Sequence, residues 1–466
     1  MLQIPLARLD IEPGHLVEWN LRSSRRRLPA PREEPGRSAS FNQDKHFAVA
    51  QEAREVNDPL SSWIAITCEL PGKLDRPALE AALLLFVRRH EVLRCEFRRL
   101  AGDLGCEVLG PDDIALECAD VGISGSTAEL RSYLADRFEK GIDTLSWPLL
   151  VMGAVVREHS STVYLCFDHI VSDGMSMPNA VNDIETAYAA LSRNGEAGLP
   201  AAGSYLDFGH EQRRRYLTLG ADDDRLAYWK AFIARNGGFF PKFPLELGVE
   251  PGRTYPTVNE SEKLLDDHEV GVLETRCRDA GGRLFMGLLA ALAVSLRRSG
   301  GPGDYRCLMP VSERGRGSWT HSMGWFVNTM PLEFSVAEDK DFPEVLAGVR
   351  AGFTEMMRNI DIPFVKAWEL LAPHHFKLRS WPFPVNFFSY MDFRKCPGGE
   401  HHPQWRPTMH VWASRSNGIN FWFHRNATGL YVNSIYVDTE EARRTTTAFR
   451  RTLTGTVTAM ARSGTL

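Results

Sequence analysis

The chain has 466 residues, of which 43% are hydrophobic and 24% charged, and its formal net charge at pH 7 is −5. This length exceeds one ordinary hydrophobic core, so we expect two domains of roughly 200 residues each. The charge gives no electrostatic case for a nucleic-acid partner, and the short basic runs at 25–27 and 213–215 are typical of solvated surface. The eight cysteines are scattered without a CxxC pair, which indicates reduced thiols and no zinc site.

No segment predicts export or membrane insertion. Arg8 and Asp10 lie where a signal peptide needs an apolar core. The longest apolar run, Leu284–Leu296, covers about 13 residues, fewer than the roughly 20 that span a bilayer. We therefore expect a cytoplasmic protein with at most peripheral membrane contact. Separately, we expect a monomer.

Strands and helices alternate along residues 1–204, which we expect to form an N-terminal lobe. In chain order the patterns predict a charged, Pro- and Ser-rich lead-in over 22–45, a strand over Trp63–Leu70, a helix over Ala78–Arg89 capped by Asp75, antiparallel strands over Leu149–Val156 and Val163–His169, and a helix carrying Val181, Ile184, Tyr188 and Leu191. A Gly- and Ala-rich joint at 195–203 ends this lobe.

Residues 205–466 are expected to form a C-terminal lobe. In chain order the patterns predict helices over Tyr205–Tyr216, Asp222–Ala234 and Leu284–Arg298, strands over Tyr305–Val311 and Phe326–Phe334, a helix over Val345–Asn359, a strand over Pro384–Tyr390, and three or four strands within 408–437. Strands and helices in both halves, with antiparallel pairs, favour two α/β sandwiches in tandem.

The strand over Val163–His169 leads into the most informative segment of the chain, residues 167–174 (FDHIVSDG). A histidine at the end of a strand, before a tight turn, is held rigidly, as a general base must be. Asp173 follows four residues later, and Gly174 has a backbone freedom that other residues lack. The histidine of an isolated HxxxDG motif more often belongs to the core or to a loop than to an active site, so the functional interpretation of this motif depends on the rest of the chain.

Other catalytic chemistries find less support. Cys166 lies three residues before His169 on the strand, so its side chain points to the opposite face and we expect a core thiol. No serine or cysteine nucleophile with a partnered base is evident. A metal site built on His169 and Asp173 would lack a third ligand, and the pair at 401–402 has no ligands nearby. No metal or redox cofactor is expected.

Several segments in chain order resemble the condensation-domain superfamily, whose acyltransferases use CoA or carrier-protein thioesters. The matching segments are Leu74-Asp75 with Ala78-Leu79, His90–Phe97 (similar to HExLRxxF), His169–Gly174, Tyr205–Phe208 with Tyr228-Trp229, Ser312–Arg314, Met323–Leu332 and Phe387–Tyr390. Each match is weak alone, but their shared order over residues 60–390 is specific.

Within the superfamily the chain is similar to the actinobacterial polyketide-associated (Pap) acyltransferases, especially the branch that acylates trehalose. The segments that carry this similarity are Asp168-His169, Gly203–Phe208, Phe243–Gly248, Gly324–Phe326 and Val385–Phe388. One departure matters. Condensation domains of peptide synthetases usually carry two adjacent histidines, whereas here the first is Asp168, which argues against peptide-bond formation.

The resemblance implies an α/β fold of two chloramphenicol-acetyltransferase-like lobes in a V-shaped pseudo-dimer, with His169 at their junction. It implies that His169 takes the proton of an acceptor hydroxyl or amine and returns it to the leaving thiolate, with acyl-CoA or a phosphopantetheinyl thioester as substrate and no cofactor. Asp173 is expected to pair with Arg314 of the second half rather than to orient His169. The backbone N–H of Gly174 is a candidate donor to the oxyanion.

Asn328 and Ser389 are candidates for contact with the acceptor or the intermediate, although packing is the favoured role for both. The resemblance implies a free-standing enzyme of lipid or natural-product biosynthesis that esterifies a polar hydroxyl compound, with trehalose as one candidate. Four tryptophans offer flat faces to a sugar or to the core: Trp325, Trp381, Trp405 and Trp412. Two alternatives stay open, an amide-forming enzyme with an amine acceptor and a catalytically silent domain that binds carrier proteins.

Overall fold

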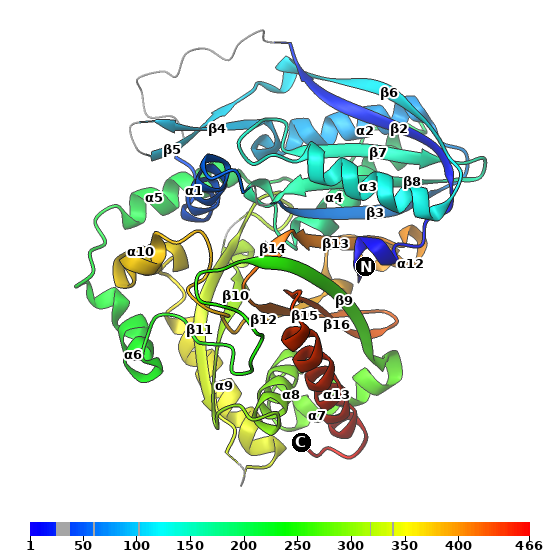
Figure 1. Cartoon of the computed structure of the whole chain (residues 1–466). Helices are drawn as coiled ribbons and strands as arrows, with labels where there is room; N and C mark the ends of the chain where they lie inside the picture. Colours follow the sequence, from blue (N-terminus) through cyan, green and yellow to red (C-terminus); the bar gives the residue numbers. More distant parts are fainter. Residues whose placement is uncertain (25–37, 59–60, 101–102, 317, 338–339) are drawn as a thin grey trace. The chain divides into compact units, whose positions relative to one another are not determined.

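The computed structural model describes the chain except residues 25–37, 59–60, 101–102, 317 and 338–339, so the basic run at 25–27 lies outside the described residues (Figure 1). The chain folds into two compact units, each assembled from separate stretches. Unit 1 comprises Met1–Thr218, Ser312–Val327 and Phe393–Ala413, and unit 2 comprises Leu219–Val311, Asn328–Asp392 and Ser414–Leu466. The lobe boundary between residues 204 and 205 stays a prediction, and the helix that follows it belongs to unit 1.

Unit 1 contains a seven-stranded sheet in the order β1-β13-β3-β8-β7-β2-β6. Its strands are β1 (Leu2–Gln3), β2 (Gly14–Ser23), β3 (Ser62–Pro71), β6 (Ile114–Ser124), β7 (Leu150–Val156), β8 (Ser160–Asp168) and β13 (Thr408–Ala413). Strands β4 (Cys95–Leu100) and β5 (Asp103–Val108) form a separate antiparallel two-stranded sheet. Strand β8 pairs antiparallel with β3 on one side and β7 on the other, so it is a central strand.

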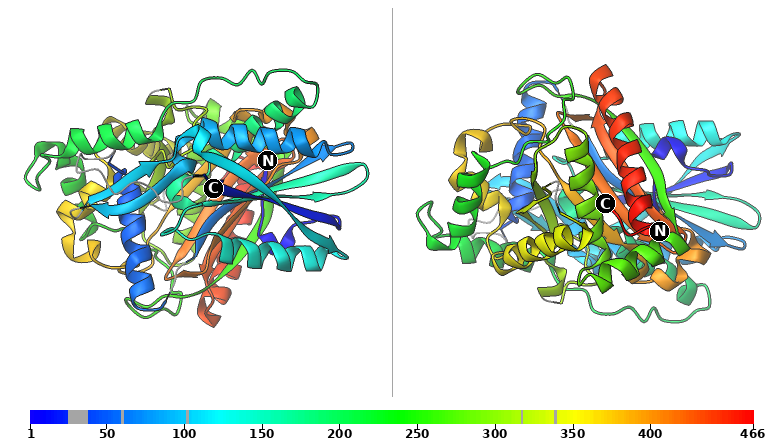
Figure 2. Two further views of the ribbon diagram at one scale, coloured as in Figure 1. Left: turned by 90° about the horizontal axis from the view of Figure 1, so that it is seen from above. Right: turned by 90° about the horizontal axis from the view of Figure 1, so that it is seen from below.

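Helices cover both faces of this sheet. The helices of unit 1 are α1 (Phe41–Glu55), α2 (Arg76–Arg89), α3 (Thr127–Gly141), α4 (Ser176–Leu191), α5 (Tyr205–Tyr216) and α12 (His402–Trp405). One core cluster joins α3 to β3, β7 and β8 and includes Phe138, Trp63 and Cys166. Helices α2 and α4 pack against each other, and Figure 2 shows α2 and α3 on opposite sides of the strands. The alternating residues of 163–168 predict a half-buried strand, but because both faces of the sheet are covered, β8 is buried almost throughout.

Unit 2 contains a five-stranded sheet in the order β12-β15-β16-β9-β14 and a strand pair β10-β11. Its strands are β9 (Tyr255–Asp266), β10 (Asp304–Ser312), β11 (Val327–Ser335), β12 (Phe388–Asp392), β14 (Arg415–Ser416), β15 (Ile419–Asn426) and β16 (Gly429–Val437). Its helices are α6 (Ala227–Asn236), α7 (Asp267–Asp279), α8 (Leu284–Arg298), α9 (Phe342–Arg358), α10 (Phe364–Leu371), α11 (Pro373–Phe376) and α13 (Glu440–Arg462). Helix α8 packs against α7, α9 and α13.

Most predicted elements are present, and the departures have local causes. Asp75 caps α2, because its carboxylate accepts the N–H of Ala78 at 3.0 Å. The helix expected over Asp222–Ala234 begins only at Ala227, after a short 3-10 turn, and the strand expected from Pro384 begins at Phe388. The prediction of a lead-in over 22–45 is wrong at its C-terminal end, where α1 begins behind a capping box formed by Ser40 and Gln43.

Among the described helices none alone is long and apolar enough to cross a membrane. Helices α7 and α8 taken together meet the length and composition of a membrane span, but their axes meet at 95°.

Candidate active site

The site is built where β8 ends. Asp168 is the last residue of the strand, and its carboxylate caps the 3-10 turn His169–Val171 by accepting the N–H of Ile170 at 2.7 Å. The hydroxyl of Ser172 donates to the backbone carbonyl of Asp168 at 2.9 Å. These bonds hold the backbone on both sides of His169, so the imidazole projects from a rigid point.

The ring nitrogens of His169 form no hydrogen bond with any other residue that the structure describes, and Nδ1 is buried. The indole of Trp325 lies against the ring, with 3.9 Å between the centroids and 34° between the planes. Burial, and then the neighbouring His46, lower the pKa of His169, whereas its own backbone carbonyl, Asp173 and Asp168 raise it. A lowered pKa favours the neutral imidazole, which keeps a lone pair that can accept a proton.

His90, in the HExLRxxF-like segment, provides a contrast. It is buried, its Nε2 lies 2.8 Å from a carboxylate oxygen of Asp183, and its Nδ1 accepts the backbone N–H of Met323 at 3.3 Å. With both nitrogens used by the fold, His90 has no lone pair left for chemistry. Of the two motif histidines, only His169 is free to act as a base.

The ion pair predicted between Asp173 and Arg314 is present, with 2.8 Å between Oδ1 and Nη2, and both side chains are buried. Oδ1 of Asp173 also accepts the N–H and hydroxyl of Ser176, at 2.8 and 2.9 Å, and Oδ2 accepts the N–H of Phe326 at 3.0 Å. The guanidinium lies over the ring of Phe326 and donates to the backbone carbonyls of Trp319, Ser322 and Gly324. Asp173 is thus saturated by partners other than His169, which supports the structural role.

The remaining predicted residues lie in different surroundings. Gly174 is not among the described glycines with positive φ, so its turn does not use the left-handed backbone that the sequence suggested. Asn328, in unit 2, donates to the carbonyls of Ile360 and Ile362 at 2.8 and 2.9 Å and accepts the N–H of Phe364 at 2.8 Å. Its amide therefore holds the connection between α9 and α10.

Ser389 lies on β12 of unit 2, opposite Trp422 of β15 in the register of the sheet. Of the four tryptophans, only Trp325 is in ring contact with His169. Trp381 stacks on Trp368 in unit 2, and Trp412 packs against the core around Trp63. Trp405 contacts His401 in unit 1.

Cys166 is a core thiol, as expected: it is fully buried, and burial raises its pKa well above the usual range. Among the described residues no group of three His, Cys, Asp or Glu side chains is arranged to hold a metal ion.

Two side chains that the sequence analysis missed belong to the same site. His46 on α1 places Nε2 3.1 Å from Oδ1 of Asp168, and the hydroxyl of Thr144 donates to Oδ2 at 2.6 Å. The ring of His46 lies 5.6 Å from Trp325 and 6.2 Å from His169, measured between centroids. The Ser40/Gln43 capping box was the available sequence signal for α1, but no local signal places this helix beside the end of β8.

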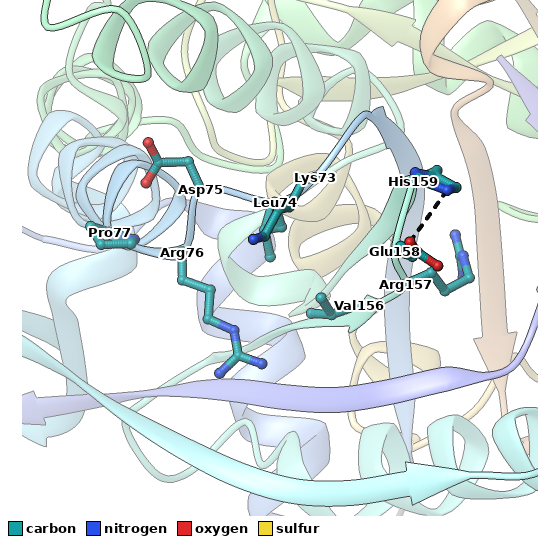
Figure 3. A pocket seen from close by; sticks show the side chains of 9 residues that line it. All are labelled: Lys73, Leu74, Asp75, Arg76, Pro77, Val156, Arg157, Glu158 and His159. Atoms are coloured by element: carbon teal, nitrogen blue, oxygen red, sulfur yellow. Dashed lines mark ion pairs between the residues drawn. The ribbon is translucent and has the colours of Figure 1, made fainter.

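A surface pocket lies elsewhere in unit 1, between the turn after β3 and the turn between β7 and β8 (Figure 3). Its lining includes Lys73, Arg76, Arg157 and His159, and Glu158 forms an ion pair with His159. These residues flank the first residue of β8, whereas His169 follows the last, and a nine-residue strand is roughly 30 Å long. The pocket is therefore separate from the His169 site.

A profile of the Condensation domain family matches residues 55–388, so the chain belongs to the condensation-domain family. Within it, the chain is 28% identical over 386 residues to the 2'-acyl-2-O-sulfo-trehalose (hydroxy)phthioceranyltransferase PapA1 of Mycobacterium tuberculosis (strain ATCC 25177 / H37Ra), covering 81% of this chain and 73% of PapA1. It is 24% identical over 349 residues to the acyltransferase PapA3 of Mycobacterium tuberculosis (strain ATCC 25618 / H37Rv), covering 75% and 73%.

Among solved structures, the PapA2 acyl transferase superposes with a TM-score of 0.86 at 22% identity, over 99% of this chain and 100% of that one. The predicted α/β condensation-domain fold is thereby confirmed, as is the resemblance to the Pap proteins. The protein is an acyltransferase.

Proposed function

We propose that this acyltransferase moves an acyl group from a CoA or acyl-carrier-protein thioester to a hydroxyl of a polar acceptor, with His169 as general base. The observation that carries the proposal is the placement of the His169 imidazole: it is fixed at the end of β8 and is not hydrogen-bonded to any other described residue. Burial lowers its pKa, which favours the neutral form that a general base needs.

In the proposed reaction the acceptor oxygen attacks the thioester carbonyl carbon while His169 takes the hydroxyl proton. A new C–O bond forms, and the carbonyl oxygen carries the negative charge of the tetrahedral intermediate. When the C–S bond breaks, the proton passes from His169 to the leaving thiolate, so the products are an ester and a free thiol. The backbone N–H of Gly174 is the proposed donor to the oxyanion.

The acceptor class rests on the relatives. PapA1 is named for a trehalose derivative, and we propose a polar polyhydroxyl compound, with trehalose as the first candidate. Asp168 in place of the first histidine of the peptide synthetases supports an alcohol over an amine. The half-buried indole of Trp325 beside His169 would give the sugar an apolar face.

The test uses the purified full chain with palmitoyl-CoA or a palmitoyl-loaded carrier protein as donor. Trehalose, a monohydroxylic alcohol and a primary amine serve as acceptors, with thiol release and product mass as readouts. An ester that requires His169 supports the proposal. Acylation of the amine alone would replace it with the amide-forming alternative, and the absence of any transfer beyond hydrolysis would favour a silent carrier-binding domain.

A further inference from the structure

The second imidazole of the site, His46, is anchored to the carboxylate beside the proposed base. Its Nε2 lies 3.1 Å from Oδ1 of Asp168 and 3.5 Å from the hydroxyl of Thr144. The Asp168 side chain is only 2% exposed and the His46 side chain 18%. A buried carboxylate needs a cationic or hydrogen-bonding partner, and His46 is the ionisable partner of Asp168 in the part of the chain that the structure describes.

Asp168 is also the residue that fixes the backbone of His169. Its Oδ1 caps the 3-10 turn through the N–H of Ile170, and the same oxygen receives His46. A shift of the carboxylate would therefore change both the turn and the direction in which His169 projects.

Aromatic contacts through Trp325 provide a second connection between His46 and His169. Trp325 contacts both imidazoles: its ring is tilted by 34° against His169 at 3.9 Å and lies edge-to-face with His46 at 5.6 Å and 80°. Because Nε2 of His46 lies against Asp168 while the ring of His46 contacts the indole, His46 supports Trp325, which in turn packs on the proposed base.

We propose that His46 is a positioning residue for acyl transfer, which holds Asp168 and Trp325 in the places that fix the His169 imidazole. This inference rests on the proposed function, since it assumes that His169 is the base. His46 comes from α1, is not among the buried residues of that helix, and is not part of the core cluster around Phe138.

The charged groups around His169 give the role of His46 a measurable effect on the pH dependence of kcat/KM. Asp168 precedes it on the chain, His46 faces it from α1, and Asp173 lies four residues on, already bound to Arg314. His46 lowers the pKa of His169, so replacing His46 with a side chain that cannot be protonated removes this effect. His169 then holds a proton more tightly, and the acid limb of the kcat/KM profile moves to higher pH.

Two variants distinguish the hydrogen bond that His46 makes from its effect on the pKa of His169. The side-chain amide introduced by His46→Gln retains an N–H donor near the place of Nε2 but cannot be protonated, whereas His46→Leu removes both the donor and the charge. We expect His46→Leu to lower kcat by at least about tenfold with little change in the KM for the donor, and His46→Gln to recover to within a few-fold of the wild type. Both variants should move the acid limb to higher pH, because both remove the influence of His46 that lowers the pKa of His169.

Melting temperatures are measured for both variants. If His46→Leu does not fold, the acid limb of the kcat/KM profile of His46→Gln alone tests the role of His46. A folded His46→Leu enzyme with wild-type kcat, a His46→Gln enzyme as impaired as His46→Leu, or unmoved acid limbs would each overturn the proposal. His169→Ala is assayed in parallel. If that variant stays active, the base assignment fails and the role of His46 fails with it; if it is inactive beside unaffected His46 variants, only the role of His46 fails.

Discussion

The indole of Trp325 lies against the imidazole of His169, with 3.9 Å between the ring centroids, although the two residues are far apart in sequence. Both belong to unit 1, because the stretch Ser312–Val327 from the second half of the chain folds into it. The same stretch contributes Arg314, which binds Asp173. The proposed base and the segment that supports it thus form one compact unit.

His169→Ala should lower kcat/KM for acyl transfer by about 10²- to 10⁴-fold, the usual contribution of a positioned acid–base group. The melting temperature should stay near that of the wild type, because His169 has no hydrogen bond to another described residue. Thiol release from an acyl-CoA donor measures the effect. His159→Ala is the matched control, since His159 is 88% exposed and lies beyond the other end of β8. Near-normal turnover in His169→Ala would contradict the base assignment.

The pH dependence of the wild-type enzyme follows from the same histidine. Burial lowers the pKa of His169 from its ordinary value of 6.5, so the imidazole stays neutral and basic below that pH. The acid limb of kcat/KM should therefore have its midpoint below pH 6.5. A midpoint above 6.5 that persists in every donor and acceptor pair would indicate a different titrating group.

Removing one partner of the Asp173–Arg314 pair should destabilise the fold by about 3–5 kcal/mol, because the other charge is left buried and unpaired. Urea unfolding of Asp173→Ala, Arg314→Ala and the double variant measures this loss, and the double variant should cost less than the sum of the single ones. Arg253→Ala is the control: its pair with Glu250 is 66% exposed on both sides and is worth about 0–1 kcal/mol. Normal stability with a selective loss of catalysis would instead assign Asp173 an orienting role toward His169.

Gly324→Ala should disturb the segment that carries Trp325. Gly324 has φ +144°, and a Cβ there would lie 2.5 Å from atoms of the Tyr205 ring, too close for any packed side chain. Its backbone also bonds Ser176 and Arg314. We expect a loss of about 1–3 kcal/mol in stability, together with reduced kcat as Trp325 shifts. Gly315→Ala is the control, since a Cβ there meets nothing within 4 Å. Wild-type stability and activity in Gly324→Ala would contradict this account.

The sequence predicted what is local and missed what depends on tertiary contacts. The strand over Val163–His169 and the turn after it could be predicted because their residues are neighbours in the chain. The Asp173–Arg314 pair spans 141 positions, and only the family resemblance pointed to it. His46 lies 122 positions from Asp168 in a stretch whose charged composition suggested a lead-in, so neither periodicity nor resemblance assigned it to the site.

Glu185 on α4 gives a prediction about stability that is independent of catalysis. Its side chain is buried, Oε1 has no hydrogen-bond partner among the described residues, and burial raises its pKa from 4.5 to about 8, with the Cys68 thiol opposing this through a hydrogen bond. A pKa raised in the folded state means that the stability it contributes is fully present below pH 4.5 and is lost as the pH rises through about 8. Glu185→Gln keeps the shape of the neutral acid without a titrating proton. The variant should therefore gain stability relative to the wild type as the pH rises from 5.5 to 8.5, measured by urea unfolding at several pH values. Glu158→Gln is the matched control, because it is the same substitution at a side chain that is 87% exposed. A stability difference between Glu185→Gln and the wild type that does not change with pH would show that the buried carboxyl is not the titrating group.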